Sequence, residues 1–128
     1  MNKIQGDLIR LALNGDFDVI IHGCNCFCTM GAGIALTIKK VFPEAYKTDL
    51  TTKKGSWKKL GTYSVTKVER HGHQIIIVNA YTQFHYASGP ANKADYNAIR
   101  VFLNSICRFL RKMLIEISAQ LYNPSPSP

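Results

Sequence analysis

The sequence predicts an α/β fold in which a mixed sheet carries helices on both faces. The first observation is a short β-branched run at 18–22, followed by a glycine turn at 31–33 and a segment of helical period at 34–42. The second is a pair of alternating segments, 61–69 and 74–79, separated by a polar turn. A buried strand that leads through a turn into a helix is typical of parallel sheets, whereas a hairpin is antiparallel, so both kinds of pairing are expected.

The chain has 128 residues, enough for one domain with a hydrophobic core. Hydrophobic residues make up 46% of it, which excludes a disordered chain. We expect one domain over residues 1–122 and a flexible Pro/Ser tail over 123–128. The formal charge of +8 favours polyanionic partners without specifying which.

The remaining elements follow from local patterns. Pro43 ends the helix predicted at 34–42. Residues 44–59 predict a short helix that passes into an exposed basic loop, with Lys47, Lys53, Lys54, Lys58 and Lys59. From Lys93 onward the period predicts a long amphipathic helix. Its apolar face holds Ala94, Ala98, Phe102, Ile106, Leu110 and Leu114, and its basic stripe holds Arg100, Asn104, Arg108, Arg111 and Lys112.

A cytoplasmic protein is expected. No apolar run approaches the roughly 20 residues that cross a bilayer, and residues 1–7 lack the apolar core of a signal peptide. Three of the four cysteines crowd together at Cys24, Cys26 and Cys28, with Cys107 far away. This spacing differs from the framework of a secreted disulfide-rich domain, so reduced thiols are expected.

The segment that joins the first strand to its helix is the most informative for function. Ligands of α/β sheets bind where strands end and helices begin. Gly31 and Gly33 allow close approach of an anion, and the N–H groups of the first helical turn attract phosphate. The segment lacks both the Walker A lysine and the third glycine of the dinucleotide fingerprint, so a simple tight turn remains the alternative.

His22, Cys24, Cys26 and Cys28 alternate along the chain, which raises the question of a metal site. Zinc sites favour Cys-x-x-Cys spacing, and alternate residues of an extended strand lie about 6.6 to 6.8 Å apart, too far for one tetrahedral ion. We therefore expect no metal and no other cofactor, with the thiols filling the core. His22 is either a satisfied polar group at a strand end or a general acid or base beside the phosphate loop.

Further binding surfaces are suggested downstream. The aromatic rings around Tyr81 and Phe84 either line a nucleotide pocket or cap the core at the sheet edge. The lysines of 53–59 and the last helix either hold nucleic acid or form a solvated face. That helix is more typical of a core helix than of one lying on an anionic membrane.

Three motifs in order resemble the macro domain: Gly6-Asp7-Leu8, then 19–25 (Val-Ile-Ile-His-Gly-Cys-Asn), then 30–35 (Met-Gly-Ala-Gly-Ile-Ala). The resemblance covers about residues 2–104. Within the family it is nearest to the branch that contains ADP-ribose 1″-phosphate phosphatases and related phage and bacterial proteins. It implies a three-layer α/β/α fold that binds ADP-ribose in a crevice at the strand ends.

The resemblance also implies roles for individual residues. Asp7 would accept the adenine amino group beside the Leu8 N–H, and Asn25 would bind the distal ribose. The backbone N–H groups of Gly31, Ala32, Gly33 and Ile34 would cradle the pyrophosphate. His22 would transfer a proton or activate water in removing a 1″-phosphate, and Tyr81, Gln83 and Phe84 would border the same end.

The sequence departs from the family pattern in two places. A related subgroup that strips ADP-ribose from acidic side chains uses a lysine after the strand at 75–80, where this chain has Tyr81-Thr82-Gln83. The family also continues after the long helix with a strand, a second phosphate loop and a helix, and we expect these to be missing here. The leading hypothesis is binding of ADP-ribose, with hydrolysis of ADP-ribose 1″-phosphate. The alternative is a non-enzymatic reader of poly-ADP-ribose or nucleic acid that uses a basic surface.

Overall fold

The computed structural model describes residues 7–85 and 95–122, so the predicted tail at 123–128 lies outside it. Its elements, in chain order, are α1 Leu8–Leu13, β1 Val19–Cys24, α2 Gly33–Val41, α3 Pro43–Leu50, the 3-10 helix η1 Trp57–Lys59, β2 Tyr63–Arg70, β3 His73–Tyr81 and α4 Tyr96–Tyr122. The predicted strand at 18–22, helix at 34–42 and hairpin at 61–79 are all present, with small differences at their ends.

The described strands form one mixed sheet in the order β1-β3-β2. β1 runs parallel to β3, with Val19 opposite Ile76 and Cys24 opposite Tyr81. β2 runs antiparallel to β3 and joins it through the two-residue turn His71-Gly72, where both residues have left-handed φ angles of 54° and 76°. This turn matches the right-handed twist of the strands. The mixed pairing predicted from the sequence is therefore confirmed.

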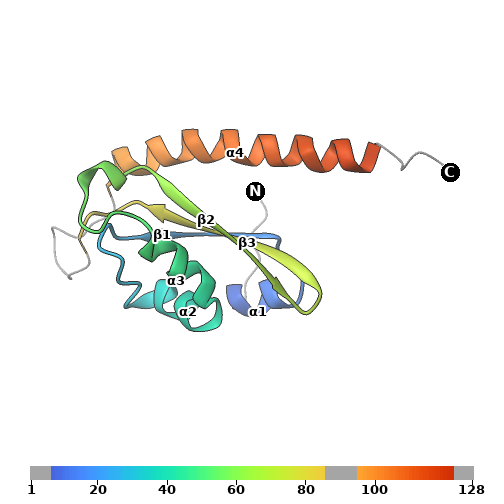
Figure 1. Ribbon diagram of the computed structural model, residues 1–128, viewed down its shortest axis with the longest axis horizontal. Helices are drawn as coiled ribbons and strands as arrows, with labels where there is room; N and C mark the ends of the chain where they lie inside the picture. The colour runs from blue at the N-terminus through green and yellow to red at the C-terminus, as the bar shows by residue number, and fades with distance from the viewer. Residues whose placement is uncertain (1–6, 86–94, 123–128) are drawn as a thin grey trace.

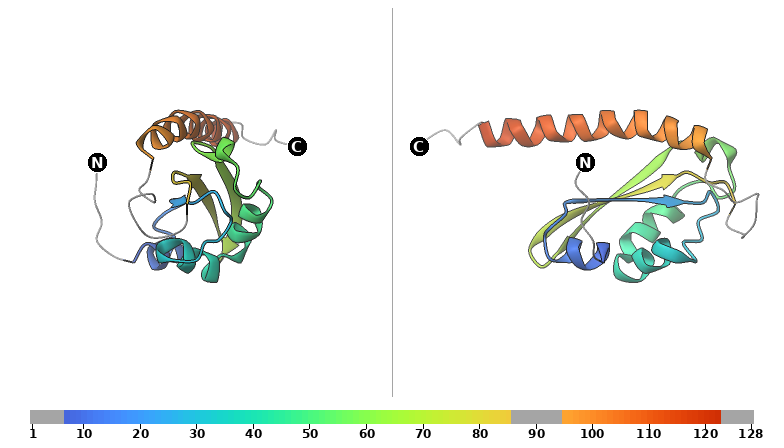
Figure 2. Two further views of the ribbon diagram at one scale, coloured as in Figure 1. Left: turned by 90° about the vertical axis from the view of Figure 1, so that its left-hand side faces the viewer. Right: turned by 180° about the vertical axis from the view of Figure 1, so that it is seen from behind.

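The sheet lies between two helical layers, which confirms the three-layer α/β/α arrangement (Figures 1 and 2). Helices α1, α2 and α3 cover one face, and α4 crosses the other. The central strand β3 is buried on both faces, and its residues alternate between two hydrophobic clusters. Ile75 and Ile77 pack with the α1–α3 layer, while Ile76, Val78 and Ala80 pack with α4.

The α2–α3 junction differs from the expected exposed segment at 44–59. Pro43 ends α2, as predicted, but it also begins α3, because proline is well suited to the first position of a helix. Ala45 and Asp49 are buried on the inner side of α3. Lys59 is also buried, and its Nζ donates a hydrogen bond to the Cys26 carbonyl oxygen. The prediction that this segment is exposed is thus wrong at three positions.

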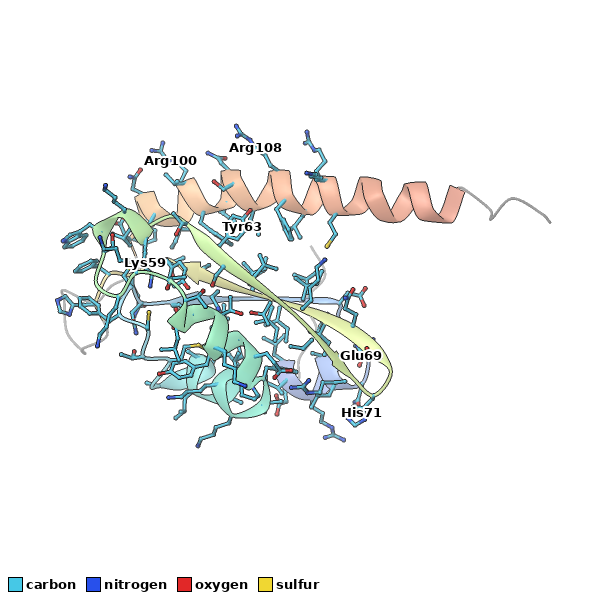
Figure 3. The ribbon with its side chains drawn as sticks, viewed as in Figure 1. Lys59, Tyr63, Glu69, His71, Arg100 and Arg108 are labelled. Carbon is cyan, nitrogen blue, oxygen red and sulfur yellow. The ribbon has the colours of Figure 1, made fainter. Side chains whose placement is uncertain are left out.

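Helix α4 has the predicted one-sided pattern over its described side chains. Ala98, Phe102 and Ile106 are buried, and Phe102 and Phe109 contact the Tyr63 ring of β2. The predicted basic stripe is exposed, with Arg100 and Arg108 directed away from the sheet (Figure 3). Lys93 and Ala94 lie outside the described residues.

Residues 116–122 continue α4 and do not form a strand. The helix therefore runs past the end of the sheet (Figure 1). None of the helices in the described part of the chain is long and apolar enough to cross a membrane.

Candidate functional site

A cavity of about 370 Å³ lies where β1 ends and α2 begins. This is the carboxyl end of the parallel β1–β3 pair, the position at which α/β sheets bind ligands. The residues around it come from five parts of the chain: the end of β1, the loop that follows it, the first turn of α2, the helix α3, and the segment after β3. They are Gly23, Cys24, Asn25, Thr29, Met30, Gly31, Ala32, Gly33, Ile34, Ala35, Asp49 and Gln83.

The glycine turn borders this cavity as the sequence predicts. Gly33 has a left-handed φ of 59°, and an added Cβ at this position would meet nothing within 4 Å. Ala32 occupies the N-cap of α2 in an extended conformation, and no side chain caps the helix. The first turn of α2 thus borders the cavity, and no side-chain cap accepts hydrogen bonds from its backbone N–H groups. Such N–H groups can bind an anion. Met30 is buried in the core and anchors the turn.

Asn25 stabilises the loop that it begins. Its Oδ1 accepts from the Phe27 N–H at 2.8 Å, and its Nδ2 donates to Thr29 Oγ1 at 2.7 Å. This side-chain mimic of a backbone turn is a common role for asparagine after a strand. The chain turns here, so Cys26 and Cys28 leave the extended path of His22 and Cys24. In the described ranges, no three or more His, Cys, Asp or Glu side chains form a candidate metal site.

His22 is buried beside the cavity and does not line it. Its Nε2 lies 2.7 Å from Asn79 Oδ1, and burial lowers the pKa of the imidazole. Cys24 lines the cavity and contacts His22, with its Sγ 3.6 Å from His22 Nδ1. Burial raises the pKa of the Cys24 thiol, so it is protonated at neutral pH. The pair is therefore a neutral thiol beside a neutral imidazole.

Sequence reasoning missed two buried charged residues at this site. Asp49 is 1% exposed, and its Oδ1 accepts from the Tyr81 hydroxyl at 2.8 Å. Lys59 Nζ lies 3.4 Å from Cys28 Sγ and 4.4 Å from the centre of the Tyr81 ring. Burial raises the pKa of Asp49, and Lys59 opposes this shift. The four-residue spacing from Ala45 is the signal that would have placed Asp49 on the inner face of α3.

The structure brings together only some of the residues predicted to bind a ligand. Asn25, Gly31, Ala32, Gly33, Ile34 and Gln83 line the cavity, whereas Asp7, Leu8, Tyr81 and Phe84 do not. Asp7 caps α1, with Oδ1 accepting from the Ile9 N–H at 3.0 Å, and Leu8 begins that helix. Tyr81 is buried, and the Phe84 ring stacks on Trp57.

Comparison with known proteins defines the family. No protein-family model matches the chain. An uncharacterized 17.5 kDa protein of Enterobacteria phage T4, from the tk-vs intergenic region, is 37% identical over 114 residues, covering 88% of this chain and 70% of the phage protein. The macrodomain of Mycobacterium tuberculosis DarG superposes with a TM-score of 0.66 at 23% identity, covering 85% of this chain and 66% of that one. This chain has the macrodomain fold and belongs to the family of the phage protein. The predicted macro-domain resemblance is confirmed at the level of the fold.

This macrodomain also has a shorter region of sequence similarity to a phosphatase. The ADP-ribose 1″-phosphate phosphatase of Meyerozyma guilliermondii is 40% identical over 47 residues, which cover 37% of this chain and 26% of the phosphatase. The macrodomain therefore spans about a quarter of the phosphatase and about two thirds of the DarG macrodomain.

Proposed function

We propose that this macrodomain binds ADP-ribose in the cavity beside the glycine turn. The observation that carries the proposal is the uncapped first turn of α2 on an open cavity at the carboxyl end of the parallel strands. Backbone amides in that position bind a pyrophosphate without a compensating side chain. The similarity to a macrodomain and to an ADP-ribose 1″-phosphate phosphatase supports the same ligand.

The parts of the ligand are assigned by the resemblance and by the position of each residue. Gly31, Ala32, Gly33 and Ile34 hold the pyrophosphate, and Asn25 holds the distal ribose. Gln83 lines the cavity at that end, with Tyr81 and Phe84 beside it in the chain. At the adenine end, Asp7 uses only Oδ1 to cap α1, which leaves Oδ2 for the adenine amino group beside the Leu8 N–H.

Calorimetry with ADP-ribose tests this assignment. Gly31→Glu adds a carboxylate beside the proposed pyrophosphate site, where an added Cβ meets only the Thr29 carbonyl oxygen at 3.9 Å. We expect this variant to fold and to lose binding, whereas Asn104→Glu on the exposed side of α4 retains it. Absence of heat with the folded parent at millimolar ADP-ribose would refute the proposal.

The finer proposal is hydrolysis of ADP-ribose 1″-phosphate, with His22 in proton transfer. His22 does not line the cavity, but it contacts Cys24, which does, so Cys24 offers a route for a proton between them. We expect His22→Gln to lower phosphatase turnover by roughly 100-fold or more, the usual range for a lost general acid or base. The matched control is His73→Gln, since His73 contacts the Ala12 carbonyl oxygen far along the sheet. Unchanged turnover in His22→Gln would remove His22 from the reaction.

A second candidate function, recognition of nucleic acid or poly-ADP-ribose, is favoured by an exposed aromatic surface with a basic border. Trp57 is 66% exposed, and one face of its ring stacks on Phe84, with 3.3 Å between ring centroids. The exposed lysines nearby in the chain are Lys53, Lys54 and Lys58. Stacked rings among cations are typical of surfaces that bind single strands. Lys59, which the sequence placed on this basic surface, is buried and does not contribute to it.

The single tryptophan of the chain makes this second candidate directly measurable. A single-stranded oligonucleotide should quench Trp57 fluorescence, with an affinity that falls steeply with salt and does not change in Asp7→Ala. Replacing Lys53, Lys54 and Lys58 by alanine should weaken binding, while replacing Arg108 and Arg111 on α4 should not. The reverse pattern would move the site to α4, and competition with poly-ADP-ribose distinguishes the two polyanions.

We further propose a cytoplasmic location, because all four cysteines are free and three are buried.

A further inference from the structure

Lys59, the last residue of η1, is a buried lysine whose amino group lies against a thiol (Figure 3). Its Nζ donates to the Cys26 carbonyl oxygen at 3.3 Å and lies 3.4 Å from Cys28 Sγ. In the described part of the chain, no carboxylate forms a salt bridge with this amine. Lysine is almost never buried unless it is paired, and here the reactive group within its reach is the Cys28 thiol.

The fold holds Cys28 in this position against the preference of its backbone. Cys28 has a φ of 56°, a left-handed value that residues with a side chain rarely adopt. Such a conformation persists where surrounding contacts enforce it, and it is concentrated at functional positions. The contacts here are from Cys28 Sγ to the Asp49 carbonyl oxygen at 3.2 Å and to Thr52 Oγ1 at 3.5 Å. Thiol and amine are therefore held together by the native structure.

Cys28 differs from its two buried neighbours in ways that favour oxidation. Burial raises the pKa of both Cys24 and Cys26, so these two remain thiols at neutral pH. The thiolate is the form that oxidants attack, and a neighbouring lysine favours it. Cys28 is also the most accessible of the three, at 7% exposed against 4% and 0%, and it contacts a surface turn at 51–55. A molecule little larger than water can therefore reach Cys28 more readily than it reaches the other two.

We propose that Cys28 and Lys59 form an oxidative modification site, at which hydrogen peroxide links Cys28 Sγ to Lys59 Nζ through a sulfenamide bond. In the first step the sulfur attacks one peroxide oxygen, the O–O bond breaks, and a sulfenic acid and water are formed. In the second step the free amine of Lys59 attacks the same sulfur, in place of the thiol or backbone nitrogen with which a sulfenic acid usually condenses. The S–N bond forms, the S–O bond breaks, and the leaving hydroxide takes a proton from the nitrogen to become water. Sulfur is oxidised by two electrons, peroxide is reduced to two molecules of water, and the protein loses two hydrogen atoms.

The link joins two segments that are 31 residues apart in the sequence. Such a cross-link restricts the unfolded chain, so the oxidised protein should have a higher thermal midpoint than the reduced protein. Oxidation of Cys28 to a sulfinic acid would bury a charge instead and should lower the midpoint. Cys28 directly precedes Thr29 and Met30, which line the cavity, so the oxidised and reduced forms differ next to the cavity wall.

Peptide mapping of peroxide-treated protein tests the proposal without any nucleotide, and so independently of the proposed function. The protein carries Cys107→Ser, which removes the exposed thiol. Trypsin does not cleave after a modified lysine, so digestion without reductant should leave peptide 11–39 joined to peptide 59–67. The joined peptide should weigh two hydrogen atoms less than its parts and should separate on treatment with dithiothreitol.

Matched variants identify the two atoms that react. Cys28→Ser and Lys59→Met should abolish the joined peptide, whereas Lys58→Met, at the exposed lysine beside it, should retain it. Cys26→Ser should also retain it, because Cys26 contributes only its carbonyl oxygen to Lys59. Protein treated with peroxide in denaturant should be cleaved normally after Lys59, since the contact of 3.4 Å exists only in the fold. This comparison stands even where Lys59→Met fails to fold.

Three results would overturn the proposal. The first is normal cleavage after Lys59 in native protein treated with peroxide. The second is a disulfide between Cys26 and Cys28 in place of the link, which would assign the oxidation to the thiols alone. The third is an equal yield of the joined peptide in denaturant, which would show that the native contact does not direct the reaction.

Discussion

Replacing Asn79 by alanine tests the buried polar network that supports the cavity. Asn79 is fully buried and forms three side-chain hydrogen bonds, to His22 at 2.7 Å, the Ala45 carbonyl oxygen at 3.0 Å and Ser64 at 3.1 Å. Ser64 keeps Tyr81 as a partner and the Ala45 carbonyl lies within the backbone ladder of α3, but the His22 N–H loses its partner. An orphaned buried group costs about 1 to 3 kcal/mol, so Asn79→Ala should lower the free energy of unfolding by about 1 to 3 kcal/mol.

Chemical denaturation followed by circular dichroism measures this loss. For a domain of this size each kcal/mol lowers the melting midpoint by roughly 3 to 6 °C. The matched control is Asn97→Ala: Asn97 is exposed, and its one hydrogen bond is to Arg100. That variant should stay within about 0.5 kcal/mol of the parent. A loss below about 1 kcal/mol in Asn79→Ala would show that the network does not contribute to stability as the distances imply.

Three further predictions concern the fold and its pH dependence. Gly61 has a φ of 84°, and an added Cβ would lie 2.9 Å from Val101 Cγ1 on α4. Gly61→Ala should therefore lower the free energy of unfolding, measured with denaturant, by about 2 to 4 kcal/mol. An unchanged free energy would contradict the packing of α4 against the loop that contains Gly61. Burial lowers the pKa of His22 in the folded state, so its contribution is fully present above pH 6.5 and is lost as the pH falls toward the folded value. His22→Gln should flatten the stability curve in that acid range, and an unaltered slope would show that His22 is not the titrating group. Cys107 is exposed and the other three cysteines are buried, so a thiol reagent should modify one thiol in the native protein and all four after unfolding. Rapid modification of more than one thiol in the native protein would contradict the burial of Cys24, Cys26 and Cys28.

The elements that the sequence predicted share a local origin. The strand and helix on either side of the glycine turn follow from β-branched residues, helical period and Pro43, all within about one element of each other. The hairpin follows from alternation around a short polar turn. The exposed basic face of α4 follows from its period, as Arg100 and Arg108 show. In each case the pattern itself contains the physical cause.

The features that the sequence did not predict depend on contacts between distant segments. Lys59 belongs to a lysine-rich stretch, and only the fold shows that the Cys26 carbonyl oxygen lies within reach of its Nζ. The spacing from Ala45 indicates the inner-face position of Asp49, but its hydrogen-bond donor Tyr81, 32 residues away on β3, is seen only in the fold. Phe27 and Phe84 contact one another, with ring centroids 5.0 Å apart, although Phe27 lies in the loop after β1 and Phe84 lies after β3. No local pattern records such pairings.

The two pairings of β3 differ greatly in the length of chain that must be closed to form them. The hairpin with β2 closes a two-residue turn, whereas the pairing with β1 joins Val19 to Ile76 across α2 and α3. Chain closure over the longer separation costs more entropy, so the hairpin is expected to form early and β1 to dock late. The cavity lies at the end of β1, so we expect it to be assembled late in folding. A ligand in the cavity should therefore stabilise the pairing of β1 with β3 and make local opening of β1 rarer. Amide hydrogen exchange of β1 should slow when the ligand binds.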